Sequence, residues 1–264
     1  VLYTVADMEQ EGTQNMQQPP HNPKYNMVAG DWANTPNNWF NKKPILGDWT
    51  VNRNPDNNKC QPSTVTVEYE LGTITYKNNN LGYRGADFTG NGGVIGDSFV
   101  YGTGVKNPFA QQLNIDNLGA PASSNDEITK TAIQYINNFK PPFVIVCWTF
   151  AHRREWVDEN FDTVKIFRRA DWHNNSSIKP TDVELAFAEI SNNGYNYYTW
   201  LKNKMLLELF CDKNFVQLIQ VHNNIIWREN IAYDLGLAVD NLHPGQGWHD
   251  AMTKYLKEKL KKDA

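Results

Sequence analysis

The sequence predicts an α/β protein in which helices cover both faces of a central parallel sheet. Two observations predict this fold. From about residue 92 to the C-terminus, short apolar runs typical of buried strands alternate with longer segments that have helical spacing. Residues 1–64, in contrast, are rich in Asn, Gln, Pro and Gly and have little periodicity, so turns are expected to dominate there.

The composition indicates a sizeable core and no strongly charged partner. Of the 264 residues, 40% are hydrophobic and 12% aromatic, and 25 basic residues stand against 29 acidic ones. This balance lacks the basic footprint of a nucleic-acid-binding protein. No apolar run approaches the ~20 residues that span a bilayer. We therefore expect neither nucleic acid nor a membrane as a partner, and the sequence leaves the oligomeric state open.

The cysteines and histidines predict neither a disulfide framework nor a metal site, because there are three cysteines, no CxxC pair and scattered histidines. We expect no metal and no organic cofactor. Residues 1–20 lack the charged and apolar regions of a signal peptide. A cytoplasmic location is therefore the default expectation, although the absence of an initiator Met leaves a longer precursor open.

Residues 1–88 are expected to form an Asn-rich N-terminal extension, followed by a larger domain over residues 89–264. Near the end of the extension, residues 64–76 alternate between polar and apolar side chains, with a break at Gly72. This alternation predicts a β-hairpin. Whether the extension is a domain of its own or wraps around the core is left open.

The larger domain is expected to contain four strands and four helices. The predicted strands are the apolar runs at residues 93–97, 113–118, 143–148 and 215–221. The predicted helices are the segments with helical spacing at residues 123–139, 181–190, 195–210 and 248–260. Ser123, Ser124 and Asn125 are expected to cap the first of these helices.

Ser98 is the first candidate for chemistry, because Gly96-Asp97-Ser98 directly follows the first strand of the larger domain. In parallel sheets, functional sites lie beyond the carboxyl ends of the strands. A serine nucleophile also needs a base, a group that orients the base, and donors for the developing oxyanion. The alternative is that Ser98 only caps the next helix.

Asp240 and His243 form the second candidate, in the segment Asp240-Asn241-Leu242-His243-Pro244 before the last helix. An Asp three residues before a His can bind one imidazole nitrogen and leave the other for a nucleophile. The alternative is an ordinary turn, since all these residue types except Leu favour turns.

Gly119 is the third candidate, because it lies where a predicted strand leads into a capped helix. Without a side chain, its backbone N–H can come close to a substrate, and the following helix N-terminus favours negative charge. The alternative is a plain strand-to-helix loop.

Together these segments resemble the SGNH hydrolases, also called the GDSL family of esterases and lipases. Gly96-Asp97-Ser98 is similar to the family's first block, Gly119 to the glycine of its second, and Asp240 with His243 to the DxxH of its fifth. The stretch 80–85 is similar to a segment that precedes the first block in some members. The resemblance covers roughly residues 80–264, with the blocks in the family's order.

The resemblance implies a flavodoxin-like three-layer α/β/α catalytic domain over residues 89–264 and ester hydrolysis through an acyl-enzyme. It implies that Ser98 is the nucleophile, His243 the base and Asp240 the residue that orients the base. It further implies that the backbone N–H groups of Ser98 and Gly119 form part of the oxyanion hole.

The sequence departs from the family after the central strand, where the family carries GxND with an Asn that donates to the oxyanion. Residues 146–155 contain no Asn. Thr149, His152 and Arg153 are the alternative donors. The sequence also leaves open an incomplete oxyanion hole, with slow or lost catalysis. Asn125 is interpreted as a helix cap and not as a replacement.

We expect Trp148, Arg153 and Trp248 to contact substrate, with core packing as the alternative for both tryptophans. For the charged cluster at residues 152–155, the alternative is an exposed helix start. The expected function is a serine ester hydrolase of short acyl esters, with O-acetylated carbohydrate as one candidate substrate class. An acyltransferase with the same three residues, or a non-catalytic binding or structural module, are the alternatives. The acyl chain and the alcohol are left open.

Overall fold

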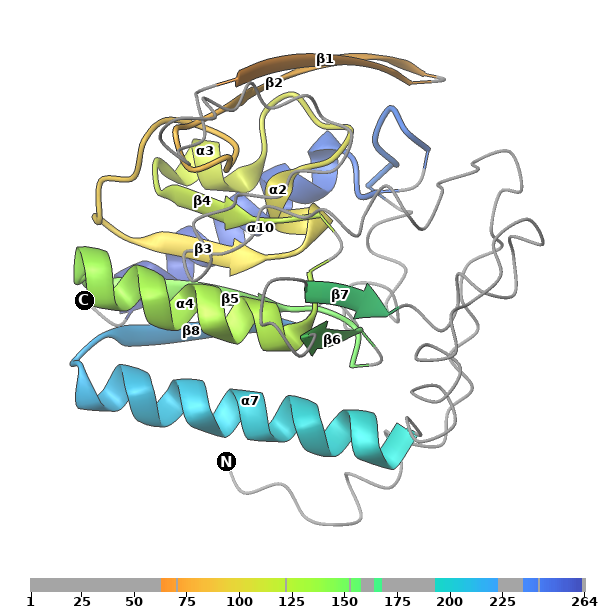
Figure 1. Cartoon of the computed structure of the whole chain (residues 1–264). Coiled ribbons are helices and arrows are strands. Elements are labelled where there is room, and N and C mark those ends of the chain that lie inside the picture. The colour runs from red at the N-terminus through yellow and green to blue at the C-terminus, as the bar shows by residue number, and fades with distance from the viewer. Residues whose placement is uncertain are drawn as a thin grey trace, which may run out of the picture.

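A computed structural model describes residues 63–69, 71–121, 123–151, 153–157, 164–167, 193–222, 235–241 and 243–262. The described residues contain a four-stranded parallel sheet with helices on both faces (Figure 1), which confirms the predicted α/β class. The strands of this sheet are β3 (Gly93–Gly96), β4 (Asp116–Gly119), β5 (Phe143–Trp148) and β8 (Gln217–His222).

The strand order β4-β3-β5-β8 places β3 and β5 side by side at the centre of the sheet. From β3 the chain passes first to β4 on one side and then returns to β5 on the other. The loops that follow β3 and β5 therefore leave the sheet in opposite directions. Such a switch point is where open α/β sheets form their ligand crevices.

The prediction for β4 is shifted by three residues at its start. Residues 113–118 were the expected strand, but Phe109–Leu113 form a short helix, α3, and β4 begins at Asp116. Pro108 precedes the first turn of α3, and Asn114 ends the helix in a left-handed conformation with φ 55°. The apolar side chains at the start of α3 are buried in the core. In so short a run, periodicity does not distinguish a helix from a strand.

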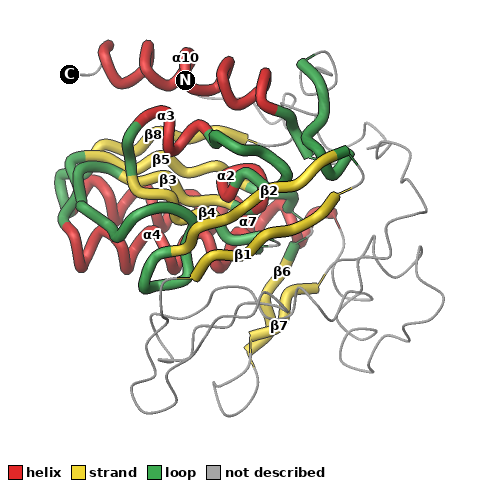
Figure 2. The backbone as a smooth tube through the Cα atoms, turned by 90° about the horizontal axis from the view of Figure 1, so that it is seen from above, coloured by secondary structure: helices red, strands yellow, loops and turns green. Residues whose placement is uncertain are grey.

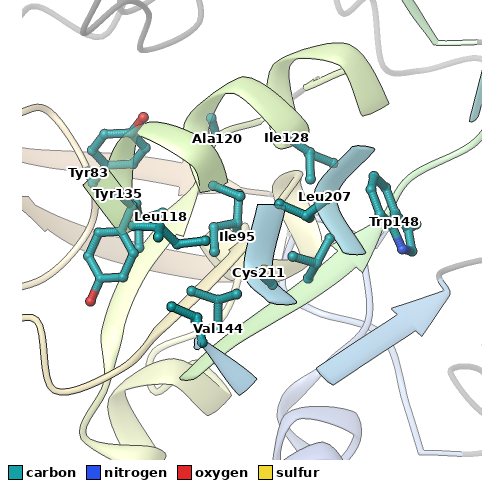
Figure 3. Close-up of a cluster of buried hydrophobic side chains, with 14 residues drawn as sticks. Tyr83, Ile95, Leu118, Ala120, Ile128, Tyr135, Val144, Trp148, Leu207 and Cys211 are labelled. Carbon is teal, nitrogen blue, oxygen red and sulfur yellow. The ribbon is translucent and has the colours of Figure 1, made fainter. Parts of the chain in front are cut away.

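One face of the sheet is covered by α4 (Asn125–Phe139) and α7 (Asn193–Lys213), as Figure 3 shows in close-up. Ser124 caps α4 by accepting a hydrogen bond from the Glu127 N–H, at 3.1 Å. This confirms Ser124 as a cap, although the helix begins two residues after the predicted start at residue 123. Asn125 is the first residue inside the helix, so its predicted role as a cap is wrong.

The core on this face joins both helices to the sheet. Its side chains from the sheet and the two helices include Ile95, Leu118, Val144, Ile128, Tyr135, Leu207 and Cys211. Each is essentially removed from water, so the hydrophobic effect fixes the two helices on the sheet.

The opposite face is covered by α2 (Ser98–Tyr101), α3 and α10 (Gln246–Lys262). Seen from above, α10 lies on the side of the sheet away from α4 and α7 (Figure 2). The buried side chains of this second core include Val94, Phe99, Phe109, Ile145, Trp248 and Leu256. Both candidate segments, at Ser98 and at His243, adjoin this face.

The predicted hairpin is confirmed as the antiparallel pair β1 (Ser63–Tyr69) and β2 (Gly72–Asn78). It runs across the loops above the sheet (Figure 2). The Leu71 N–H donates to the Val239 carbonyl at 3.1 Å, so the hairpin is bonded to the loop that carries the second candidate motif. Hydrogen bonds thus cross the predicted domain boundary at residue 88, and that boundary stays a prediction.

A second antiparallel pair, β6 (Arg154–Val157) and β7 (Val164–Phe167), follows β5. The alternative that residues 152–155 start a helix is therefore wrong, because Arg154 and Glu155 lie in a strand. The predicted helix at 181–190, as well as residues 1–62, lie outside the described residues. Among the helices that the structure describes, none combines the length and apolar character needed to cross a membrane.

Candidate active site

Ser98 lies at the carboxyl end of β3, as the first residue of α2. Asp97 caps this helix, because its Oδ1 accepts a hydrogen bond from the Phe99 N–H at 3.0 Å. The alternative that Ser98 itself is the cap is therefore wrong. A Cβ at Gly96 would lie 2.4 Å from the Val100 Cγ2 atom, so glycine is what allows α2 to fold back against its own strand. Ser98 is 4% exposed.

Asp240 and His243 form the hydrogen-bonded pair that the sequence predicts. The His243 Nδ1 atom lies 2.5 Å from Asp240 Oδ2, and the His243 N–H donates to Asp240 Oδ1 at 3.1 Å. The Ala238 N–H donates to the His243 carbonyl at 2.8 Å, which closes the loop around them. In the neutral tautomer whose Nδ1–H faces the carboxylate, the lone pair lies on the other ring nitrogen, Nε2. The segment thus forms a tight loop, and that loop holds the His243 imidazole in a fixed orientation.

The structure brings the Ser98 segment and the His243 loop together. The Phe99 ring meets the His243 ring edge-on with centroids 5.8 Å apart, and the Val239 N–H donates to the Gly104 carbonyl at 3.2 Å. Within the described residues, no hydrogen bond joins the Ser98 hydroxyl to the His243 ring. Catalytic hydrogen bonds are often long without substrate and tighten in the Michaelis complex.

Gly119 ends β4, and its backbone N–H already has a partner. It donates to Asn117 Oδ1 at 2.9 Å, while the Asn117 Nδ2 donates to the Val100 carbonyl at 3.1 Å. A Cβ at Gly119 would lie 2.2 Å from the Tyr101 backbone nitrogen. The close approach of α2 therefore explains this glycine by packing alone. Its role as an oxyanion donor stays a prediction, which requires the N–H to leave or share its bond to Asn117.

Thr149 directly follows β5, and both of its donors are engaged. Its hydroxyl donates to Asp97 Oδ2 at 2.6 Å, and its N–H donates to Asn125 Oδ1 at 2.9 Å. The Asn125 amide in turn donates to the Thr149 carbonyl at 3.2 Å. Asn125 thus ties the start of α4 to the end of β5, a role that sequence reasoning missed. The local sequence indicates a helix start at Ser124, but it gives no indication that Asn125 bonds to Thr149, 24 residues away.

Arg153 is the third member of this group and sits beside the Ser98 segment. Its Nη1 donates to Asp97 Oδ2 at 2.6 Å and to Thr149 Oγ1 at 2.8 Å. Its side chain is 13% exposed, whereas that of Asp97 is fully buried. No described residue accepts a hydrogen bond from the Nη2 or Nε groups of Arg153. Three residues were the alternative oxyanion donors. The N–H and hydroxyl of Thr149 are both hydrogen-bonded to other residues, and His152 lies outside the described residues. Arg153 keeps N–H groups that no described residue accepts a hydrogen bond from.

Both tryptophans expected to contact substrate are packed in the core. Trp148 is 1% exposed and its Nε1–H donates to Gln220 Oε1 at 2.8 Å. Trp248 is 3% exposed and meets the rings of Phe99 and Phe109 edge-on. This burial supports the packing alternative for both residues, and contact with substrate stays a prediction that this geometry does not support.

His249, which neighbours Trp248 in α10, is a structural histidine. Its Nδ1 accepts a hydrogen bond from the Phe109 N–H at 3.2 Å, and its ring stacks on Phe109 with centroids 5.7 Å apart. Burial, and then the positive charge of Arg84, lower the pKa of His249 to about 3. The imidazole is therefore neutral at physiological pH and serves as a fixed acceptor at the start of α3.

Among the described residues, no group of three His, Cys, Asp or Glu side chains is arranged so that it could hold a metal ion. In comparisons with known proteins, no family model matches the chain and no curated protein sequence matches it. The resemblance to the SGNH hydrolases therefore rests on the sequence motifs alone.

Proposed function

We propose that this protein is a serine ester hydrolase with a flavodoxin-like catalytic domain of the SGNH type. The observation that carries the proposal is the buried Asp240–His243 pair, packed against the segment that begins with Ser98. Two further observations support it. Ser98 follows β3 at the switch point of the sheet, and the strand order β4-β3-β5-β8 agrees with a flavodoxin-like arrangement.

In the proposed reaction, His243 Nε2 accepts the Ser98 proton while Ser98 Oγ forms a bond to the ester carbonyl carbon. Asp240 holds the imidazole in the required tautomer and stabilises the imidazolium that forms. The tetrahedral intermediate then collapses, its bond to the alkoxide breaks, and His243 returns the proton to the leaving alcohol. Water attacks the acyl-Ser98 ester by the same steps and releases a carboxylic acid.

Negative charge develops on the carbonyl oxygen in this reaction and needs preorganised donors. We propose that the Ser98 N–H and the Arg153 guanidinium supply them. The Ser98 N–H belongs to the first turn of α2, whose N–H groups have no carbonyl partner inside the helix. Arg153 lies beside Asp97, the residue before Ser98, and replaces the Asn of the family with a positive charge.

The proposed substrates are short acyl esters, and O-acetylated carbohydrate is one class of them. We test the reaction by nitrophenyl acetate hydrolysis and by labelling with a serine-specific fluorophosphonate. Ser98→Ala is expected to lower kcat by at least ~10⁴-fold and to abolish labelling. Thr199→Ala, which removes another buried hydroxyl in α7, is the matched control and should retain both. Equal rates in wild type and Ser98→Ala would overturn the proposal.

One observation favours a second candidate, a binding module without catalysis. Two of the donors implied or considered for the oxyanion hole, at Gly119 and Thr149, are already bonded to other side chains. Under this candidate, neither wild type nor Ser98→Ala reacts with the fluorophosphonate. An acyltransferase, in contrast, would be labelled at Ser98, and excess sugar acceptor would divert the acyl group from hydrolysis.

A further inference from the structure

The Asp240 carboxylate rests on a loop that contributes no motif residue. This loop, residues 102–107, follows α2 and is called the Gly104 loop below. A Cβ at Gly104 would lie 3.0 Å from Asp240 Cγ and 3.1 Å from its Oδ1. The Gly104 carbonyl also accepts the hydrogen bond from Val239, the residue before Asp240. The position of Gly104 therefore determines where the carboxylate can lie.

Tyr76, from β2 of the N-terminal hairpin, holds Gly104 in place. The Gly104 N–H donates to the Tyr76 hydroxyl at 2.7 Å, and the Tyr76 and Tyr69 hydroxyls are themselves 2.7 Å apart. Tyr76 is fully buried, so no water replaces this bond if it is lost. The hairpin thus contacts both sides of Asp240, through Gly104 and through the Leu71–Val239 hydrogen bond.

Arg84 fixes the rest of the Gly104 loop. Arg84 is 2% exposed, and its guanidinium donates to four backbone carbonyls on both sides of Gly104, those of Tyr101, Gly102, Val105 and Lys106, at 2.6–3.2 Å. It also lies over the Tyr76 ring, 4.8 Å from the centroid. Among the described residues no carboxylate pairs with it. A buried charge is costly unless it is compensated, so these carbonyl bonds hold both the arginine and the loop.

We propose that Tyr76 and Arg84 are positioning residues for the Asp240–His243 pair. They act through Gly104, and neither touches the reacting atoms. The inference deepens the proposed hydrolase function and rests on it for its effect on rate. Its structural part, that Tyr76 determines the Asp240–His243 hydrogen bond, is measurable without substrate.

Tyr76→Phe keeps the ring in the core and removes the acceptor of the Gly104 N–H. The loop is then expected to shift and to move the carboxylate away from His243. Because a displacement of about 1 Å at a catalytic group can cost about 10²-fold, kcat should fall roughly 10- to 100-fold with KM unchanged. Tyr69→Phe leaves the Tyr76–Gly104 bond in place and should have a smaller effect of the same kind.

The direct measurement is the far-downfield proton resonance of the His243 Nδ1–H···Asp240 hydrogen bond. The wild type should show it, and Asp240→Asn should lose it. We expect Tyr76→Phe to shift or broaden this resonance, and Tyr69→Phe to shift it less. Tyr135→Phe is the matched control. It removes another buried hydroxyl, which donates to Asp116 at 2.6 Å on the α4 face, and should leave the resonance in place.

Two outcomes distinguish failure of this inference from failure of the proposed function. If Ser98→Ala loses activity but Tyr76→Phe keeps the wild-type resonance and kcat, the positioning role is overturned while the hydrolase proposal stands. If Ser98→Ala keeps full activity but Tyr76→Phe shifts the resonance, the hydrolase proposal fails while the structural part stands. Should Tyr76→Phe not fold, an unchanged resonance in both Tyr69→Phe and Arg84→Lys would overturn the inference.

Discussion

The two halves of the candidate site differ in how their hydrogen bonds are used. In the base half, the loop of residues 236–245, the carboxylate and imidazole are bonded in the manner that a base requires. In the oxyanion half, at the ends of β4 and β5, the donors of Gly119 and Thr149 are bonded to neighbouring side chains. The Asp240–His243 motif therefore has the geometry that its spacing predicts, whereas the donors at Gly119 and Thr149 belong to a different hydrogen-bond network.

The difference has a chemical origin at the end of β5. The Thr149 hydroxyl joins Asp97 to Arg153, because it donates to the carboxylate and accepts from the guanidinium. This arrangement places the Arg153–Asp97 ion pair directly before Ser98 in the chain. Under the proposed function, we expect the oxyanion half to depend on the N–H groups of the Arg153 guanidinium, and the base half to depend on the Asp240 carboxylate.

The largest expected effect tests the base half. Asp240→Asn keeps the size of the side chain but favours the wrong imidazole tautomer, because an amide NH₂ can face Nδ1. We expect kcat for nitrophenyl acetate to fall about 10⁴-fold. Asp250→Asn is the control, since Asp250 is bonded only to the exposed side chains of Gln112 and Gln246 among the described residues. A fall of less than tenfold in Asp240→Asn would remove the base half from the mechanism.

The next effect tests the oxyanion half. Arg153→Lys keeps a positive charge beside Asp97 but loses the Nη2 and Nε groups, which no described residue accepts a hydrogen bond from. We expect kcat to fall by about 10²-fold with a small change in KM, the size found for one missing oxyanion donor. The melting temperature should stay close to that of the wild type, because the buried carboxylate keeps its counter-charge. Wild-type kcat in Arg153→Lys would assign the oxyanion to other donors.

The smallest expected effect is on stability and comes from the buried imidazole of His249 in α10. The pKa of His249 is about 3 in the folded protein, chiefly because of burial, against an ordinary value of 6.5 in the unfolded chain. As the pH falls below 6.5 the unfolded chain takes up the proton first, so stability is complete above pH 6.5 and declines toward pH 3. Between pH 6.5 and 5 the free energy of unfolding should fall by about 2 kcal/mol from this group.

His249→Asn should remove this part of the pH dependence, since the amide oxygen can accept the Phe109 N–H and does not titrate. The measurement is urea unfolding at pH 5 and pH 7. A dependence of similar size should remain from His222, whose pKa is lowered to about 4 by burial and then by Lys204, because both folded-state pKa values lie below pH 5. If the variant keeps the full wild-type dependence, acid sensitivity does not arise at His249, and acid inactivation has to be assigned elsewhere.

Local patterns predicted the parts of the fold that local interactions determine. Residues 143–148 form a strand with the predicted bounds, because an uninterrupted apolar run suits a strand buried on both faces. Ser124 was recognised as a cap, since its hydroxyl bonds only three residues ahead. The Asp240–His243 pair is equally local, which is why its spacing alone predicted it.

The rest depends on partners that are distant in the sequence. The Gly119 N–H faces an acceptor two residues away, but only the packing of α2 explains why glycine is needed there. Thr149 meets Asp97 across 52 residues. Arg84 lies in the stretch 80–85, yet its carbonyl partners lie at the end of α2 and in the Gly104 loop. Periodicity carries no information about such contacts. A charged residue such as Arg84 is also expected to be exposed unless its partners are known.

The contacts of the hairpin with the Gly104 loop affect how this protein can be dissected. A fragment starting at residue 89 would contain Ser98, Asp240 and His243, but it would lack Tyr76 and Arg84. Such a truncated chain would keep each motif and lose the support beneath its carboxylate. Shortened versions meant for biochemistry should therefore begin upstream of Ser63, so that the whole strand pair is retained.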